Sequence, residues 1–409
     1  MSKIILFKDK IDCCGCSACM NICPKSAITM VPDEFGFIYP QIDDLKCIEC
    51  GLCKKTCGYQ KESHKVKNLS TWVAVNKADE VLKKSASGGA FSAIAKEVLA
   101  AGGMVFGCAM ILESGELIPK HISIDRIEDL YKLQGSKYVQ SFTKDSYQQV
   151  KKLLNSEKKV LFSGTPCQIV GLYAFLGSEE YKNLYTIDII CHGVPNAKFF
   201  LDYLKELEKK KNGTITSFIF RDKQNGWGLM ASVTYKKQAG DMKKGLLNTK
   251  ISSYYSLFLS SKIYRINCYS CPYAGLSRPG NISIGDFWGI EKQHPEYLNG
   301  TKASIEKSKG VSCILVNNEH GTDLVQKYGN NLHLLPSTVD KAAECNGQLK
   351  APSPFSQDRE IIMQIYKNQG YSAVDTWYRK KVGIKYPVYI LWNAMPNNIQ
   401  KTIKKLLKH

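Results

Sequence analysis

Two runs of four cysteines with identical spacing constrain the start of this chain more than any other feature. Each run follows the pattern C-x2-C-x2-C-x3-C. In such a run three closely spaced thiolates reach three corners of one cubane, while the fourth thiolate binds the other cluster. We therefore expect one [4Fe–4S] cluster at Cys13, Cys16, Cys19 and Cys57, and a second at Cys47, Cys50, Cys53 and Cys23.

Zinc and disulfides are the two alternatives for these cysteines. Zinc usually takes four ligands in pairs rather than two runs of four. Disulfide-dense chains are usually small and secreted, whereas this chain has 409 residues and its first ten residues contain only a short apolar patch. The pattern therefore favours iron–sulfur clusters in a reducing, cytoplasmic setting. Cys14 lies outside the pattern, and we interpret it as a packing residue.

The overall charge bears on partners rather than on fold. Fifty-six basic and 37 acidic residues give a net charge of +19, although cluster thiolates would lower that value in the holoprotein. A solvated face explains any single lysine run, and the remaining positive field suits an acidic redox partner or a phosphorylated substrate. We find no nucleic-acid motif, and no apolar run reaches the roughly 18 residues of a membrane span.

Beyond the cysteine-rich module the pattern changes to alternating strands and helices. We expect an α+β ferredoxin-like module at 1–60, a linker at 61–70, an α/β domain with a mixed, largely parallel sheet at 71–350, and a basic extension at 351–409. A packed surface tail is favoured for that extension over docking on a membrane or a partner. Strands are expected at 71–76, 104–110, 159–163, 184–190 and 311–317, helices ending near 102, 176 and 328 and spanning 197–211 and 254–264, and hairpin strands at 214–220 and 231–235.

Glycine-containing turns follow two of the expected strands. Ser87, Gly88 and Gly89 open a helix, and the glycines would let a phosphate approach backbone N–H groups at the positive helix end. A tight turn without a ligand is the alternative. Thr165 and Gln168 flank a cysteine at a strand-to-helix turn, and parallel α/β sheets bind ligands at such carboxyl ends of strands.

Four further cysteines could hold one more cluster. Cys167 and Cys191 each follow an expected strand, and Cys268 and Cys271 form a C-x-x-C-P motif. The alternative is a pair of packed cysteines beside an exposed redox pair. We interpret Cys108, Cys313 and Cys345 as core residues, because none of them has a partner in the sequence pattern.

Six segments of this region together resemble the beta subunit of coenzyme F420-reducing hydrogenase and its relatives. The resemblance extends from about residue 71 to 359 and is carried by the motifs SASGGAF at 85–91, GSKYVQS at 135–141, GTPCQ at 164–168, CHGVP at 191–195, CYSCP at 268–272 and GNISIGD at 280–286. It implies FAD and a [4Fe–4S] cluster, in a family whose members often carry a ferredoxin module at one end.

The resemblance gives several residues a cofactor role. Lys137 and Tyr138 would face the flavin ring or the pyrophosphate, although a surface lysine is the alternative. His192 would donate a hydrogen bond to a cluster sulfur or protonate a substrate, although a lone histidine after a strand is more often structural. The expected flavin-binding residues are Ser87, Gly88, Gly89, Ser136, Lys137, Tyr138, Thr165 and Gln168, with Lys137 and His192 as catalytic candidates.

Two loops carry further charged residues with weaker assignments. Arg221, Asp222 and Trp227 would form part of a substrate mouth. Arg278 and Asp286 would bind cofactor or support the Cys268 loop.

These cofactors together predict a flavin-dependent oxidoreductase. Clusters pass single electrons, whereas a flavin accepts single electrons and releases a hydride. The expected partners are a redox protein (a ferredoxin-like donor or another oxidoreductase subunit) and a small-molecule substrate, with a homo-oligomer possible. F420 as substrate rests on analogy alone, because relatives differ in substrate. The alternative function is a non-catalytic electron carrier that serves a partner enzyme.

Overall fold

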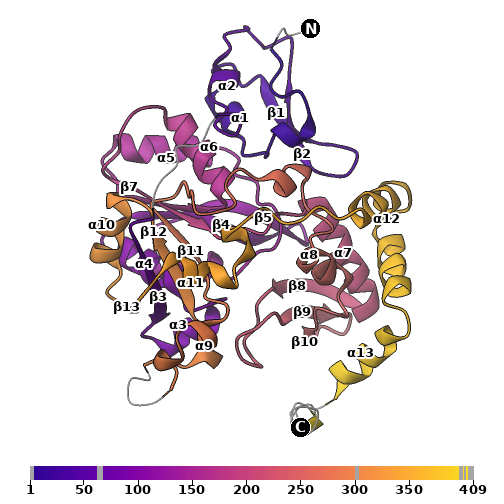
Figure 1. Ribbon diagram of the computed structural model, residues 1–409. Helices are drawn as coiled ribbons and strands as arrows, with labels where there is room; N and C mark the ends of the chain where they lie inside the picture. Colours follow the sequence, from indigo (N-terminus) through magenta and orange to yellow (C-terminus); the bar gives the residue numbers. More distant parts are fainter. Residues whose placement is uncertain (1–3, 62–67, 300–303, 396–398, 400–401, 404–409) are drawn as a thin grey trace.

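The computed structural model describes residues 4–61, 68–299, 304–395, 399 and 402–403. Most of the expected linker lies outside these residues. The N-terminal module is small and α+β, as expected. It contains helices α1 (Ala18–Ile22) and α2 (Leu52–Lys55) beside the antiparallel hairpin of β1 (Ile28–Pro32) and β2 (Ile38–Ile42), and it lies at one end of the molecule (Figure 1).

The larger domain is built on an eight-stranded mixed sheet in the order β13-β3-β12-β11-β7-β6-β4-β5. Its central strands β11, β7, β6 and β4 are mutually parallel, and its flanks pair antiparallel. Five of the eight strands point the same way, because β3 also follows the central direction. The expected mixed, largely parallel sheet is confirmed. The strands are β3 (Ser70–Asn76), β4 (Met104–Glu113), β5 (Glu116–Ile124), β6 (Val160–Gly164), β7 (Leu184–Ile189), β11 (Ile282–Asp286), β12 (Ser312–Val316) and β13 (Leu332–Ser337).

Alternation along the central strands divides their side chains between two layers of helices. Val105 and Leu161 pack under α4 and α10, whereas Phe106 and Phe162 pack under α5 and α6. Residues of β3 and β12 pack against α9 and α11 on the remaining part of the sheet. These helices are α3 (Asp79–Lys84), α4 (Ala90–Ala100), α5 (Ser146–Asn155), α6 (Pro166–Leu176), α9 (Ile290–Gln293), α10 (Glu319–Tyr328) and α11 (Val339–Glu344).

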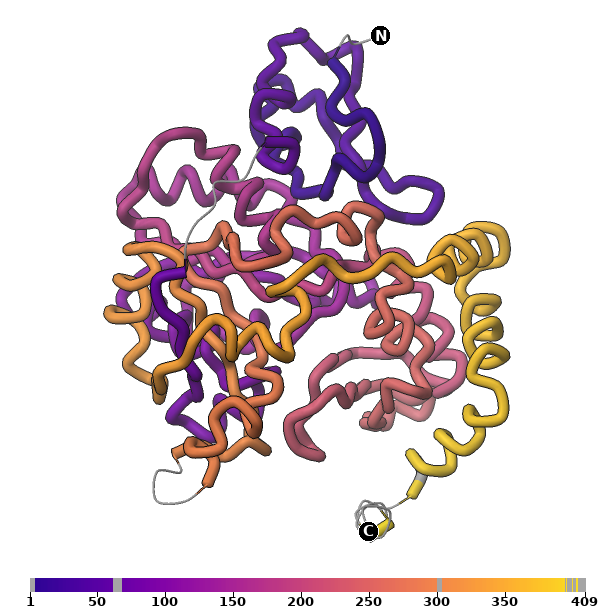
Figure 2. The backbone as a smooth tube through the Cα atoms, in the orientation of Figure 1, coloured from indigo at the N-terminus to yellow at the C-terminus, as the bar shows by residue number. Residues whose placement is uncertain are grey.

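A second, aromatic-rich core joins the expected hairpin to the C-terminal segment. The hairpin is extended by a third strand, and α12 packs Ile362, Tyr366 and Val374 into this core, in agreement with a packed tail. Figure 2 shows the C-terminal segment running along the side of the molecule to the end opposite the N-terminal module. These elements are α7 (Ala197–Lys211), β8 (Gly213–Ile219), β9 (Ala231–Lys237), β10 (Met242–Leu247), α8 (Ser253–Leu259), α12 (Asp358–Val382) and α13 (Lys385–Ala394).

The expected helix at 254–264 is too long. It ends at Leu259, and Ser261 then adopts a left-handed conformation with φ of 58°. The chain turns there so that Ile263 and Tyr264 enter the aromatic core and Arg265 reaches the N-terminal module. None of the helices in the described part of the chain is long and apolar enough to cross a bilayer.

Candidate iron–sulfur and cofactor site

The cysteines of the N-terminal module lie in the two groups that the spacing predicts. Burial raises the pKa of the Cys19 thiol well above its usual value, and the negative charges of three neighbours add to the shift, namely Cys16, Cys13 and Cys57. The other group lines one small cavity and consists of Cys23, Cys47, Cys50 and Cys53. Because Cys50 is exposed, this second group lies nearer to solvent.

The first group faces the larger domain. Arg265, which is fully buried, donates from Nε to the carbonyl of Cys13 at 3.0 Å and from Nη1 to that of Ile38 at 2.9 Å. Gln140 donates from its amide to the carbonyl of Cys14 at 3.1 Å. The charge-assisted bonds from Arg265 are of the stronger kind, so the module has a defined orientation on the domain.

The four cysteines of the larger domain also come together, although they are far apart in sequence. Cys167 lies in the first turn of α6, Cys191 follows β7, and Cys268 and Cys271 lie in and just after the short turn Ile266–Ser270. Burial raises the pKa of Cys191 well above its usual value, and the charges of the other three raise it further. Within the described part of the chain, no three His, Cys, Asp or Glu side chains converge tightly enough to hold a single metal ion.

Cys14 connects the two regions, and the sequence did not indicate this role. Its thiol is buried and hydrogen-bonds to both Cys16 of the module and Cys167 of α6. The contact with Cys14 is the largest cause that lowers the pKa of Cys16. It is also the largest cause that lowers the pKa of Cys167, to about 7. Cys14 is therefore a donor between two candidate ligand sets, and the packing interpretation is incomplete.

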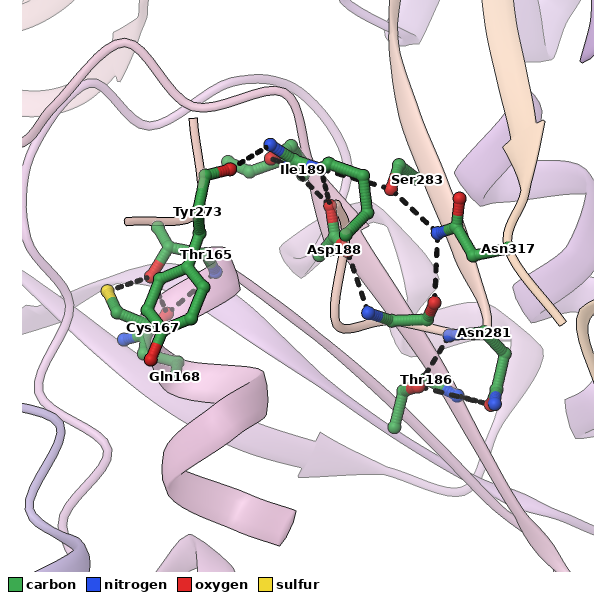
Figure 3. Close-up of polar contacts among 12 residues, drawn as sticks. Thr165, Cys167, Gln168, Thr186, Asp188, Ile189, Tyr273, Asn281, Ser283 and Asn317 are labelled. Atoms are coloured by element: carbon green, nitrogen blue, oxygen red, sulfur yellow. Dashed lines mark hydrogen bonds and ion pairs between the residues drawn. The ribbon is translucent and has the colours of Figure 1, made fainter. Parts of the chain in front are cut away.

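Arg278 fixes the loop that carries Cys268 and Cys271, as one of the two sequence interpretations proposed. Its guanidinium pairs with the carboxylate of Asp188 on β7 and donates to the carbonyls of Tyr273 at 2.8 Å and Ile189 at 2.7 Å. Figure 3 shows Asp188, Ile189 and Tyr273 converging at the end of β7. Both charged side chains are almost completely buried, at 1% and 0% exposed. This ion pair ties the C-x-x-C loop to the strand that leads into Cys191.

A cavity of about 270 Å³ opens beside these cysteines. Its lining includes the last residues of three parallel strands, Gly164 of β6, Ile189 of β7 and Asp286 of β11. This is the carboxyl edge at which ligands bind in open parallel sheets. Cys167 and Cys191 line the same cavity, so the cysteine cluster and the cavity share a wall.

Most of the residues expected to bind a cofactor line this cavity. They enter it from the start of α4, from the 135–141 segment, from the start of α6 and from the loop after β7, and they are Ser87, Gly89, Ser136, Lys137, Tyr138, Thr165, Gln168 and His192. The starts of both helices are therefore directed at one space. Gly89 precedes α4 with φ of 77°, and no side chain caps that helix. A helix start of this kind offers free N–H groups and the positive end of the helix dipole.

Gly88 is the exception among these residues, and its role at a phosphate site stays a prediction. Gly88 does not line the cavity. A Cβ atom at this position would lie 2.3 Å from the carbonyl oxygen of Ala74 and 2.6 Å from the amide nitrogen of Ser312. Glycine is therefore required here for close packing against β3 and β12.

Lys137 and His192 differ in their environments. Lys137 donates from Nζ to the carbonyls of Gln134 at 2.7 Å and Lys132 at 3.3 Å. Burial lowers the pKa of Lys137 to about 8, with the neighbouring Cys108 acting in the opposite direction. Desolvation also lowers the pKa of His192, so its imidazole is neutral at pH 7. Lys137 can therefore exchange a proton near neutral pH, whereas His192 is held in its neutral form.

Thr165 and Gln168 also have a structural role at the start of α6. They form a capping box at the start of α6, in which the backbone N–H of Thr165 donates to Oε1 of Gln168 at 3.0 Å. The Gln168 amide nitrogen donates to Ser141. The hydroxyl oxygen of Thr165 also lies 3.1 Å from the sulfur of Cys167. Through these contacts the pair orients Cys167.

Several cavity residues carried no sequence signal. His121 is buried, and its Nε2 donates to the carbonyl of Ser163 at 3.0 Å while Nδ1 accepts from Ser141 at 2.7 Å. Burial lowers the pKa of His121 to about 4, which keeps it neutral. Cys108 also lines the cavity, and Cys345 is exposed, so the core interpretation holds for neither. A lone histidine or cysteine in a strand gives no spacing pattern to detect.

Two of the expected substrate-mouth residues, Arg221 and Trp227, form a network at one side of the cavity, whereas Asp222 pairs with Lys244 and accepts from Ser232. Arg221 makes a bidentate pair with Asp286 at 2.9 and 3.1 Å and donates to the Tyr138 hydroxyl at 3.2 Å. The indole N–H of Trp227 donates to the same carboxylate at 2.8 Å, and its ring stacks on Trp288 at 4.6 Å. Asp286 and Trp288 line the cavity. The carboxylate is thus fully engaged by donors, and the aromatic rings form an ordered wall.

Comparison with known protein families gives two matches. Residues 12–61 match the 4Fe-4S dicluster domain, and residues 157–341 match the family described as the C terminus of the coenzyme F420 hydrogenase/dehydrogenase beta subunit. The chain thus has a segment similar to dicluster domains, followed by a segment similar to the C terminus of this beta subunit. The match contains the motifs at 164–168, 191–195, 268–272 and 280–286, so the inferred resemblance is confirmed over that region.

Further comparisons add little to this assignment. A chain of the F420-reducing [NiFe] hydrogenase complex from Methanosarcina barkeri, solved after xenon derivatization, is similar with 15% identity and a TM-score of 0.42 over 80% of this chain and 97% of that chain. No curated protein sequence matches. The two family matches support an iron–sulfur oxidoreductase with a beta-subunit domain that is related to F420 hydrogenase and dehydrogenase.

Proposed function

We propose that this chain is an iron–sulfur flavoprotein oxidoreductase. In this proposal it moves electrons between [4Fe–4S] clusters and FAD, with hydride exchange to a two-electron substrate that is coenzyme F420 or another organic acceptor. The observation that carries the proposal is the shared wall between four clustered cysteines and a cavity at the sheet's carboxyl edge. A carrier without a substrate would have no use for such a cavity.

The cavity suits FAD at two points. The uncapped start of α4 at Gly89 offers backbone N–H groups to a pyrophosphate. The buried Lys137 adds a positive charge in the same space, where an anion would offset its desolvation. A bound flavin would supply the conversion between single electrons and hydride. In the protein, Lys137 and His192 would hold or move a proton at the cavity wall.

The clustered cysteines suit a third [4Fe–4S] cluster. Their burial makes free thiolates unfavourable, and it raises the pKa of Cys271 to about 11 and of Cys268 to about 12. Metal binding is the usual compensation, because it deprotonates thiols that would otherwise stay neutral. Arg278 holds the C-x-x-C loop in place for this purpose, and Thr165 orients Cys167.

The three cysteine sets then form a line from solvent to the cavity. The set with Cys50 is outermost, the set with Cys16 contacts the larger domain, and Cys14 joins Cys16 to Cys167. Cys167 lines the cavity itself. A redox partner would exchange electrons at the outer set, and the substrate would react at the cavity.

Cofactor content after anaerobic purification tests the proposal. Three cubanes and one flavin predict about twelve irons and one flavin per chain. Cys167→Ser should lose roughly four irons, because serine is a harder and poorer ligand, while the dicluster spectrum persists. The matched control is Cys345→Ser at an exposed cysteine outside every set, which should keep full iron.

The flavin has its own variant. Gly89→Asp places a negative charge at the helix start, so flavin should be lost while iron content is unchanged. A content of about eight irons in the unmodified protein would rule out the third cluster. Absence of flavin, even after reconstitution, would favour the alternative function of a non-catalytic electron carrier. A screen of the photoreduced protein against F420 and other two-electron acceptors would then identify the substrate.

A further inference from the structure

The helix α13 presents an apolar face that the rest of the described chain does not cover. On α13 and the residue before it, Ile384, Val388 and Leu391 follow helical spacing and are 91%, 60% and 64% exposed. Tyr386 and Tyr389 point the other way. Tyr386 donates to the carbonyl of Ile251 at 3.4 Å, and Tyr389 lies under the ammonium of Lys250 at 4.9 Å. The helix therefore has one face on the protein and the opposite, apolar face toward solvent.

The sequence around this helix has one sign of charge. From residue 376 to the end there are eight lysines and arginines and no aspartate or glutamate. Lys380 and Lys385 are exposed, and Lys385 directly follows Ile384 in the chain. Trp392 places an amphipathic ring on α13, whereas Trp377 packs against the aromatic core. Apolar residues on one face, flanked by basic residues and aromatic rings, are the features of helices that lie in a lipid–water interface.

We infer that α13 docks this protein reversibly on the surface of an anionic lipid bilayer. Ile384, Val388 and Leu391 would insert among the headgroups and upper acyl chains, and Lys380 and Lys385 would contact acidic headgroups. Absence of any acidic residue in the segment favours an anionic surface over a protein partner, whose interface would normally offer charges of both signs. The contact is peripheral and spans no membrane.

The arrangement of the molecule is compatible with this contact. The N-terminal module and α13 lie at opposite ends of the protein (Figures 1 and 2). With α13 on a membrane, the outer cysteine set with Cys50 would face away from the lipid. That end would stay accessible to a water-soluble redox partner while the protein is held at the surface.

Vesicle co-sedimentation with the full-length, anaerobically purified protein tests the inference. Binding is expected to vesicles of phosphatidylcholine mixed with phosphatidylglycerol and to be much weaker with phosphatidylcholine alone. Added salt should weaken it, because the screening length falls. Leu391→Asp should weaken binding roughly tenfold or more, since it removes an inserted side chain and adds a repelled charge. Lys380→Gln combined with Lys385→Gln should act in the same direction by roughly tenfold or more.

A matched variant separates this effect from a general change in charge. Leu112 is an exposed leucine, 49% accessible, at the end of β4 and far from α13 in sequence. Leu112→Asp makes the same chemical change as Leu391→Asp and should bind vesicles as the unmodified protein does. Equal binding by Leu391→Asp and the unmodified protein would overturn the inference. So would equal binding to neutral and anionic vesicles, or a dimer in solution that Leu391→Asp converts to monomers without any vesicle binding.

Discussion

Replacing Arg278 by methionine tests how strongly a single buried ion pair holds the C-x-x-C loop. The substitution removes the pair with Asp188 and the bonds to the carbonyls of Tyr273 and Ile189. Asp188 would keep only weaker support, such as the backbone N–H of Gly280 at 2.8 Å. Breaking a buried pair from one side typically costs about 3–5 kcal/mol. With an m value of about 3 kcal/mol/M, the urea midpoint should fall by about 1–2 M.

The assay is anaerobic urea unfolding followed by tryptophan fluorescence, with iron content measured on the folded protein. Arg126→Met is the matched control, because Arg126 and Glu128 form a pair that is about two-thirds exposed on both sides, and it should leave the midpoint unchanged. Arg278→Met should also lose iron from the Cys268 site, since the loop is no longer held. Asp188→Leu combined with Arg278→Met should recover part of the stability, because no charge is left buried. A midpoint shift no larger than that of Arg126→Met, or additive effects in the double variant, would refute the reasoning.

Three further changes follow from the contacts around the cavity. Cys14→Ala removes the thiol that donates to Cys16 and Cys167, so the reduction potentials of the adjacent clusters should fall, while Cys14→Ser should keep them. The potentials are measured by redox titration followed by electron paramagnetic resonance, and equal potentials in both variants would contradict the donor role. Gly88→Ala forces a Cβ against the backbone of β3 and β12 and should lower the unfolding free energy by roughly 1–3 kcal/mol or more. Gly228→Ala should not lower it, because a Cβ there has no atom within 4 Å, and equal thermal midpoints of the two variants would count against the packing argument. Because burial lowers the pKa of Lys137 from 10.5 to about 8, the unfolded chain binds more protons between these pH values, and the free energy of unfolding should rise with pH across that window by up to about 3 kcal/mol. Lys137→Met should lack this rise, and parallel pH profiles of the two proteins would show that Lys137 is not desolvated.

Local sequence signals predicted those elements whose cause is local. The helix at 197–211 appears with the same bounds, because Asn196 caps its start and its apolar residues recur at helical spacing. The strands after Ser70, Val160 and Leu184 were predicted from short apolar runs followed by turns. By contrast, β5 and β13 escaped prediction, since each owes its place to pairing with a neighbouring strand rather than to its own pattern.

The candidate site shows the same division. The two cysteine groups of the N-terminal module follow from cysteine spacing alone, and the carboxyl-edge position of Thr165 and Cys191 follows from the strand–turn–helix pattern. The donor role of Cys14 did not follow, because it arises only when the module meets α6. Gly88 and Gly89 look alike in sequence, yet one packs against two strands and the other lines the cavity. Such differences depend on tertiary contacts that no local pattern encodes.

The contact between the N-terminal module and α6 explains one departure from the cysteine pattern. The second run ends in Gly58, where ferredoxin-type runs usually place proline. A Cβ at this position would lie 2.7 Å from Cγ1 of Val170 and 2.9 Å from Cβ of Ala174, both on α6. On the helix itself, a Cβ at Gly171 would lie 2.9 Å from the sulfur of Cys16.

Glycines on both sides therefore let α6 lie directly against the inner cysteine set. The two cysteine runs are equivalent in spacing, but they are not equivalent in the folded protein. Thr143 donates to the carbonyl of Cys16 at 3.0 Å, and Arg265 donates to that of Cys13. The larger domain therefore hydrogen-bonds to the backbone of the first run. Because α6 also carries Cys167 in its first turn, the close approach at Gly58 and Gly171 brings the third cysteine set next to the inner one. The order of the three sets is thus decided by which run α6 can approach, and the small residues at this contact make the approach possible.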